Sequence, residues 1–304
     1  MKPDKTLLAL AATVLLWSSA FPAIRVALRG YGFAELSFLR LAVASLALAA
    51  VAPALRIRWP ARRDLLRIMF VGASGMSAYQ LLLNWGELHV PAGTASMIVA
   101  VTPAISALLA AVFLSERLTL GKVTGSVVAL AGAAVIALAR GDTGYCTAAW
   151  AVVAAAGAQA AYHLGIKPLL RTYTGLEVAG YAMWAGTALV LPLAPAAIGA
   201  ALHAPSGALL AAVYLGALPS AAGFVVWGYA VARLTVTAAT AALYLVPVAT
   251  LAVAFVWLGE RPQPVELLGG ALTVVGVALA GRRGAGRARD AACAEGQKAP
   301  PVRV

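Results

Sequence analysis

The chain has 304 residues, of which 62% are hydrophobic and 11% are charged, and its mean hydropathy is +0.88. A soluble protein of this length needs a larger polar fraction to cover its surface, so the composition indicates an integral membrane protein. The formal net charge is +12, but the basic residues stand in short patches between apolar runs, so we expect no nucleic-acid partner.

Apolar runs long enough to cross the hydrocarbon core as helices, about 20 residues each, follow one another along the chain. They are rich in Ala and Leu and show no period-two alternation, which excludes a membrane β-barrel. The first run precedes nine others, so we interpret it as a retained helix and not as a signal peptide. The ten expected spans are 6–27, 33–54, 65–86, 91–114, 121–139, 147–167, 175–198, 207–230, 235–258 and 264–281.

The two halves of the sequence are copies of one unit. Residues 79–139 and 223–283 align without a gap at an offset of 144, which pairs Pro103 with Pro247, and upstream the offset is 142. Each copy carries five runs, an odd number, so the second copy must be inverted in the membrane relative to the first. We expect an all-α membrane protein with one repeat at 1–140, an inverted repeat at 141–283 and a disordered basic cytoplasmic tail at 284–304.

The distribution of Lys and Arg predicts the orientation. With the N-terminus inside, the cytoplasmic segments hold eighteen of these residues and the outer segments hold four, while Arg40 lies within a span. Both termini should therefore be cytoplasmic. Cys146 and Cys293 would then lie on opposite sides of the bilayer, and we expect no disulfide, metal or cofactor. We expect the protein to lie in the inner membrane, in contact with lipid, as a monomer or a homodimer. Its expected partner is a small-molecule substrate.

A short motif occurs once in each copy and carries a family resemblance. Leu-Ser-Glu-Arg-Leu-Thr at 114–119 returns as Leu-Gly-Glu-Arg-Pro at 258–262, and each is followed by a pair of glycines. The chain resembles the EamA-type repeat of the drug/metabolite transporter superfamily from about residue 7 to residue 283. The resemblance implies ten helices in two inverted five-helix repeats around a central cavity, with export of amino acids or other small metabolites as the commonest role. Further residues that carry it are Trp17-Ser18-Ser19, Phe38-Leu39-Arg40, Pro103 and Pro247.

Polar and aromatic side chains inside the spans are candidates for the cavity wall, because polar groups in a membrane normally face the protein interior. An aromatic pocket with a few amides suits neutral or zwitterionic apolar solutes. Aromatic residues near span ends can instead belong to the interfacial belts. The candidates are Trp17, Ser18, Phe21, Arg40, Tyr79, Gln80, Asn84, Gln159, Tyr162, His163, Tyr181, Trp184, Trp227 and Tyr244.

Arg40 allows two interpretations. It could bind a substrate carboxylate, or it could snorkel to the surface or pair with Glu35 or Glu177. Candidate hinges are Pro103, Pro247, Pro219 and Gly75, since proline kinks a helix, although these residues could serve packing alone. The fifth and tenth spans contain glycines that permit close contact between helices, so we expect these spans to pack against other helices or to face a dimer partner.

These features predict a secondary transporter that exports amino acids, most of all apolar or aromatic ones. A multidrug or nucleotide-sugar carrier of the same fold is the alternative. No catalytic cluster or ATP-binding loop can be assembled, so neither an enzyme nor an ATP-driven pump is expected. Every Asp and Glu falls in a loop or at a span end, and His163 is the only central group that titrates near neutral pH. Facilitated or exchange transport is therefore favoured over a carboxylate-driven proton antiporter.

Overall fold

The computed structural model describes residues 5–54, 57–113, 120–139, 143–234, 236–276 and 278–279. The Glu116-Arg117 corner and the tail at 284–304 lie outside these residues. Every regular element in the described ranges is helical. The elements of the first half are α1 (Lys5–Ala27), α2 (Phe33–Val51), η1 (Arg62–Asp64), α3 (Leu65–Val71), η2 (Gly72–Ala78), α4 (Tyr79–Gly86), α5 (Ala92–Val99), α6 (Thr102–Phe113) and α7 (Leu120–Leu138). Those of the second half are α8 (Thr143–Leu169), α9 (Gly175–Leu189), η3 (Leu191–Leu193), α10 (Ala194–His203), α11 (Ser206–Leu215), η4 (Gly216–Ala222), α12 (Gly223–Arg233), α13 (Val236–Ala241), η5 (Ala242–Tyr244), α14 (Leu245–Leu258) and a C-terminal helix, Pro264–Gly276.

Five helical stretches of the described chain are long and apolar enough to cross a membrane. A sixth is added if α9 and the η3–α10 segment, which are bent by 57° relative to each other, form one broken span. The other expected runs correspond to α8 and to shorter apolar helices at Val123–Leu138, Ala242–Leu258 and Pro264–Gly276. The structure therefore has six candidate spans at most by length and composition, and the count of ten remains a prediction. The five stretches are Lys5–Ala27, Phe33–Val51, Arg62–Gly86, Ala92–Leu109 and Ser206–Arg233.

Local sequence signals fix several helix ends. Thr174 caps α9 in a capping box, in which its hydroxyl accepts the Glu177 N–H and the Glu177 carboxylate accepts the Thr174 N–H. Gly259 ends α14 with φ at 69°, a left-handed conformation that glycine adopts without steric cost.

The third and eighth expected spans share an unusual feature at matching positions. Each contains a seven-residue π-helical turn, Gly72–Ala78 in one and Gly216–Ala222 in the other. The two turns are related residue for residue by the offset of 144. Because π turns widen a helix locally and interrupt its regular hydrogen bonding, both spans are interrupted at matching positions of the repeat.

The fourth and ninth expected spans are also interrupted at matching places. The fourth span breaks at Ala100–Val101, between α5 and α6. The ninth span changes from α13 through η5 to α14. Pro103 and Pro247 lie in the first turns of α6 and α14, just after these breaks. Proline is tolerated in a first turn because its missing N–H has no partner in the helix there.

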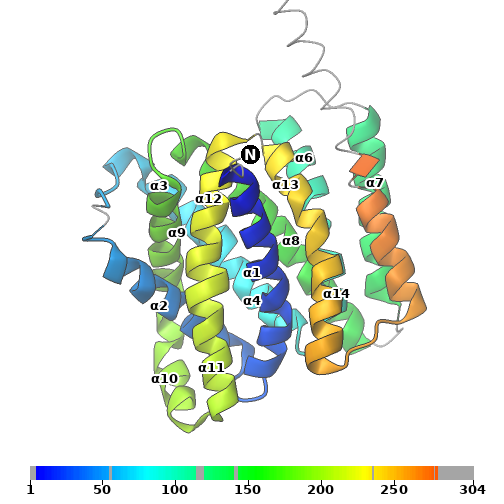
Figure 1. The fold of residues 1–304 in the computed structure, drawn as a ribbon, viewed down its shortest axis with the longest axis horizontal. Coiled ribbons are helices and arrows are strands. Elements are labelled where there is room, and N and C mark those ends of the chain that lie inside the picture. The colour runs from blue at the N-terminus through cyan, green and yellow to red at the C-terminus, as the bar shows by residue number, and fades with distance from the viewer. Residues whose placement is uncertain are drawn as a thin grey trace, which may run out of the picture.

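The fifth and tenth expected spans, α7 and the C-terminal helix, pack together at one edge of the molecule (Figure 1). A Cβ added to Gly132 would lie 2.6 Å from the carbonyl oxygen of Gly269, and one added to Gly276 would lie 2.6 Å from that of Gly125. Since Gly125 matches Gly269 and Gly132 matches Gly276, each contact is the repeat-related copy of the other. The residue numbers rise along one helix as they fall along the other, so these equivalent helices run antiparallel.

The first helix of each half packs against the opposite half. α1 contacts α11, α12 and α14, whereas α8 contacts α3, α4, α6 and α7. In Figure 1, α1 crosses the middle of the molecule beside α12 and α14. Because each first helix packs against the opposite half, the polar residues of α1 and α8 lie between the two halves, where the central cavity lies.

Candidate substrate cavity

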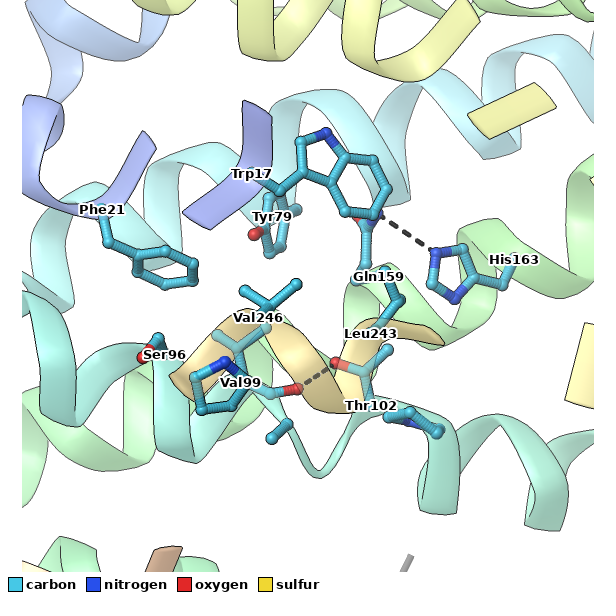
Figure 2. A pocket seen from close by; sticks show the side chains of 13 residues that line it. Trp17, Phe21, Tyr79, Ser96, Val99, Thr102, Gln159, His163, Leu243 and Val246 are labelled. Carbon is cyan, nitrogen blue, oxygen red and sulfur yellow. Dashed lines mark hydrogen bonds between the residues drawn. The ribbon is translucent and has the colours of Figure 1, made fainter. Parts of the chain in front are cut away.

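A small cavity lies between the two halves, and both halves contribute to its wall. Five candidate residues line it, namely Trp17, Phe21, Tyr79, Gln159 and His163, and Figure 2 shows their side chains around the same space. The cavity volume is about 40 Å³. Sites for small molecules usually enclose roughly 300–1,000 Å³. The structure therefore represents a closed form that must expand to admit an organic solute.

A second small cavity adjoins the first and brings in Arg40. It has a volume of about 20 Å³ and shares Trp17, Phe21, Tyr79 and Gln159 with the first. Because these shared side chains line both spaces, a shift of one ring would join them. The cavity then has an apolar aromatic wall with one cationic end.

Arg40 is buried, with 3% of its surface exposed, and none of its described neighbours forms a salt bridge with it. Its Nη1 donates to Asn84 Oδ1 at 3.4 Å and its Nη2 to Ser220 Oγ at 3.5 Å, while its Nε has no partner in the described part of the chain. Glu177 pairs with Arg58 instead, at 2.9 Å. Snorkelling and pairing with Glu177 are thus both wrong for Arg40. A buried cation held only by long contacts to neutral groups is a candidate anchor for an anionic group.

Aromatic rings support the cavity wall from behind. The ring centroid of Trp17 lies 5.1 Å from that of Phe224 and 5.4 Å from that of Trp227. The ring centroid of Trp227 lies 4.9 Å from that of His163. Tyr162 meets Phe224 edge-on at 5.4 Å. Trp227 and Tyr162 are fully buried and belong to this support, not to the wall itself.

Of the buried candidate amides on α4 and α8, Gln159 lines both cavities, whereas Gln80 and Asn84 line neither. Gln159 Nε2 lies 3.4 Å from His163 Nε2, and Asn84 Nδ2 donates to Ser37 Oγ at 2.8 Å. Gln80 is fully buried, and neither its oxygen nor its nitrogen has a hydrogen-bond partner in the described ranges. Such unsatisfied groups are costly in apolar surroundings, so they are available to water or to a polar solute once the cavity opens.

Four other candidates line neither cavity. Tyr181 and Trp184 line a separate pocket near Arg58 with a volume of about 650 Å³, where α9 packs against α2 and α3. Tyr244 packs beside a small cluster around Val101. Ser18 is buried but holds α1 to α14, since its hydroxyl donates to the Val246 carbonyl at 3.3 Å.

The candidate hinges coincide with the interrupted segments. Gly75 and Pro219 lie within the π turns η2 and η4, while Pro103 and Pro247 line the cavity at the start of α6 and α14. A Cβ at Gly75 would lie 2.4 Å from the ring of Tyr162, so glycine is needed there for packing as well. Both the hinge and the packing interpretation remain open for these residues.

The sequence interpretation missed the residues that the broken spans contribute. Most of them are small or aliphatic, so neither polarity nor aromaticity marked these, and the paired prolines were the available signal. Among the described residues, no three His, Cys, Asp or Glu side chains come together to hold a metal ion. The missed lining residues are Ser96, Val99, Ala100, Thr102, Leu243 and Val246, with Phe224 at the second cavity.

A repeated helical unit with paired interruptions around a central cavity is typical of secondary transporters. The model of the EamA-like transporter family matches this chain twice, over residues 4–138 and 146–282. This chain belongs to the EamA-like transporter family. The resemblance seen in the sequence is thereby confirmed, and with it the prediction of a multi-pass membrane transporter and not an enzyme.

Relatives of this EamA-like transporter cover nearly its whole length. A protein of Streptantibioticus cattleyicolor named "Probable terminal-alkyne amino-acid exporter" is 60% identical over 96% of this chain and 98% of its own. The "Uncharacterized transporter YdfC" of Bacillus subtilis is 34% identical over 86% of each chain. A solved crystal structure shares the fold with a TM-score of 0.64 at 23% identity, over 92% of this chain and 96% of its own.

Proposed function

We propose that this EamA-like transporter exports small apolar amino acids, including ones with a terminal-alkyne side chain, by alternating access to the central cavity. The observation that carries the proposal is Arg40, a buried guanidinium at one end of an aromatic cavity that forms no salt bridge with the described residues. A guanidinium matches a carboxylate through paired hydrogen bonds. The aromatic wall then receives the side chain. The name given to the relative at 60% identity supports the same substrate class.

The proposal includes ten spans in two inverted repeats, 1–140 and 141–283, with both termini and the tail at 284–304 in the cytoplasm. The antiparallel contact between Gly132 and Gly269 and the matching π turns support opposed repeats. The excess of basic residues in the segments assigned to the cytoplasm supports the orientation in the inner membrane. Reporter tags should place the Glu116-Arg117 and Glu260-Arg261 corners on opposite sides of the bilayer. Tags on one side alone would contradict the inverted arrangement.

Counterflow in reconstituted vesicles tests the substrate. Vesicles are loaded with an unlabelled terminal-alkyne amino acid, its saturated analogue, the corresponding decarboxylated amine or a nucleotide sugar, and uptake of a labelled terminal-alkyne amino acid is followed. We expect stimulation by both amino acids and none by the amine or the nucleotide sugar. Stimulation by the amine equal to that by the amino acids would remove the carboxylate anchor, and stimulation by the nucleotide sugar alone would favour the alternative carrier class.

A further inference from the structure

Glu87 is a fully buried carboxylate at the end of α4 that the substrate cavity does not use. It is 0% exposed, and neither of its carboxylate oxygens has a hydrogen-bond partner in the described chain. It lies at a span end, as the sequence predicts, but the turn at 87–90 folds inward against α1. Burial raises the pKa of Glu87 well above its usual range, Arg25 and Arg40 oppose this, and Glu260 adds to it. A carboxyl in such surroundings favours its neutral form.

Glu87 lies within a contact that closes one face of the protein. Arg25, near the end of α1, donates through Nη1 to the backbone carbonyls of Glu87 and Leu88, the second at 3.3 Å. Its Nε lies 3.6 Å from Glu260 Oε1, and Glu260 Oε2 accepts the Gly93 N–H at 3.4 Å. These bonds tie the end of α1 to the α4–α5 turn and to the end of α14. A surface pocket of about 380 Å³ lined by Arg25, Leu88 and Glu260 brings water up to this contact.

The opposite face has a repeat-related contact without the carboxylate. Lys167 matches Arg25 at the offset of 142, and its Nζ donates to the carbonyls of Val231 at 2.7 Å and Leu234 at 2.6 Å. Val231 matches Glu87 at the offset of 144. In each contact a basic side chain donates to backbone carbonyls at a helix end. Of the two, the Arg25 contact has a buried carboxylate beside it, whereas the Lys167 contact has Val231 at that position. This difference gives Glu87 a role that packing symmetry does not explain.

We propose that Glu87 is a proton-binding site that controls the outer gate, defined as the contact of Arg25 with Glu87, Leu88 and Glu260. When the gate closes, a proton from external water bonds to a carboxylate oxygen of Glu87 and the Arg25–Glu260 pair forms. When it opens, the pair separates and the proton returns to external water. The closed gate therefore holds one more proton than the open gate. The assignment of this face as the outer one rests on the proposed alternating access and orientation.

The charged groups around Glu87 set the sign of the response. Arg25 of α1 and Arg40 of α2 attract its ionised form, whereas Glu260 after α14 repels it. Tyr79, the first residue of α4, is the other titratable side chain on the same helix. Burial outweighs the two arginines, so a rising external pH removes the proton and favours the open gate. His89 is exposed two residues further along the chain, so it is the matched control.

Spin labels across the outer gate test the proposal in the full chain. Cysteines replace Leu28 and Gln263 in a background with Cys146→Ser and Cys293→Ser, and their separation is measured in vesicles without substrate from pH 5 to pH 9. We expect a short distance at low pH that lengthens as the pH rises above the usual range of a carboxyl group. Glu87→Gln should keep the short distance throughout, and His89→Gln should follow the parent. A parent distance that ignores pH, or a Glu87→Gln response equal to the parent's, would overturn the proposal.

A second variant leaves Glu87 intact. Val231→Glu places a carboxylate at the matching position of the inner contact, and labels at Thr172 and Ala232 should then separate with rising pH only in this variant. No response to Val231→Glu would contradict the assigned role of a buried carboxylate in the gate. Counterflow of amino acids in the same vesicles is scored apart from these distances. A gate distance that responds to pH without amino-acid counterflow would contradict the substrate proposal alone. Counterflow with a gate distance that does not respond to pH would contradict the proton site alone.

Discussion

Trp17 donates its indole N–H to the backbone carbonyl of Pro219 across 3.2 Å. The bond joins a cavity side chain of the first half to the π turn of the second half, where the irregular backbone leaves a carbonyl available. Gly223 makes room for the indole, since a Cβ there would lie 2.8 Å from Trp17 Nε1. Any solute that displaces Trp17 must therefore act on the interrupted part of the eighth expected span, which links substrate binding to a segment able to bend.

Removing this bond should slow transport more than it weakens binding. Trp17→Phe keeps an aromatic ring in the cavity but cannot donate to Pro219, so we expect a lower maximal counterflow rate with a nearly unchanged KM. Trp17→Ala also removes the ring and should raise KM as well. Trp150→Ala is the matched control because Trp150 is 48% exposed on α8 and lines neither cavity. Equal loss of rate in the Trp150 and Trp17 variants would show a general effect of removing an indole.

Arg40→Met should weaken amino-acid binding by roughly 10- to 100-fold, since a hydrogen bond to a charged group contributes about 1.5–3 kcal/mol. Arg40→Lys keeps the charge but loses the planar fork, so its loss should be smaller. The measurement is KM in counterflow, together with inhibition by the decarboxylated amine. Inhibition by the amine should not weaken in either variant. If Arg40→Met transports the amino acid with the parent KM, Arg40 does not bind the carboxylate.

Gly132→Ala should destabilise the protein, whereas Gly157→Ala should leave it unchanged or slightly more stable. A Cβ at Gly132 meets the Gly269 carbonyl at 2.6 Å, and backbone atoms cannot move away without separating the helices. Overpacking of this kind costs about 1–3 kcal/mol. A Cβ at Gly157 meets nothing within 4 Å, and alanine is favoured over glycine within a helix by about 0.5–1 kcal/mol. The free energy of unfolding, measured by titration with a denaturing detergent, should separate the two variants in opposite directions.

Glu177 has two roles that two substitutions can separate. Glu177→Gln retains a side chain able to complete the capping box with Thr174 but weakens the contact with Arg58, whose side chain is 62% exposed. Exposed ion pairs contribute about 0.2–1 kcal/mol, and loss of a cap costs about 0.5–2 kcal/mol. Glu177→Ala removes both and should lower the free energy of unfolding further than Glu177→Gln. Equal losses would show that the cap contributes nothing measurable.

Some candidate residues could be predicted from sequence because a simple rule governs which side chains face the interior of a membrane protein. Polar and aromatic side chains on α1, α4 and α8 face inward because the membrane gives them no other partner, and this rule correctly brought Trp17, Gln159 and His163 together. The same rule failed for Tyr181 and Trp184. Their side of α9 packs against α2 and α3 and not against the central cavity, and the rotation of a helix about its axis is not set by the burial rule.

The sequence by itself determined that this is a duplicated helical membrane protein of a transporter family, because composition, span length and the fixed offset are properties of the chain alone. Only the tertiary structure decided that Arg40 forms no salt bridge with any described carboxylate, that Glu87 is buried, and that the broken spans line the cavity. These facts depend on how deeply each helix lies and how it is rotated. Neither depth nor rotation follows from hydrophobicity when nearly every face of every helix is apolar.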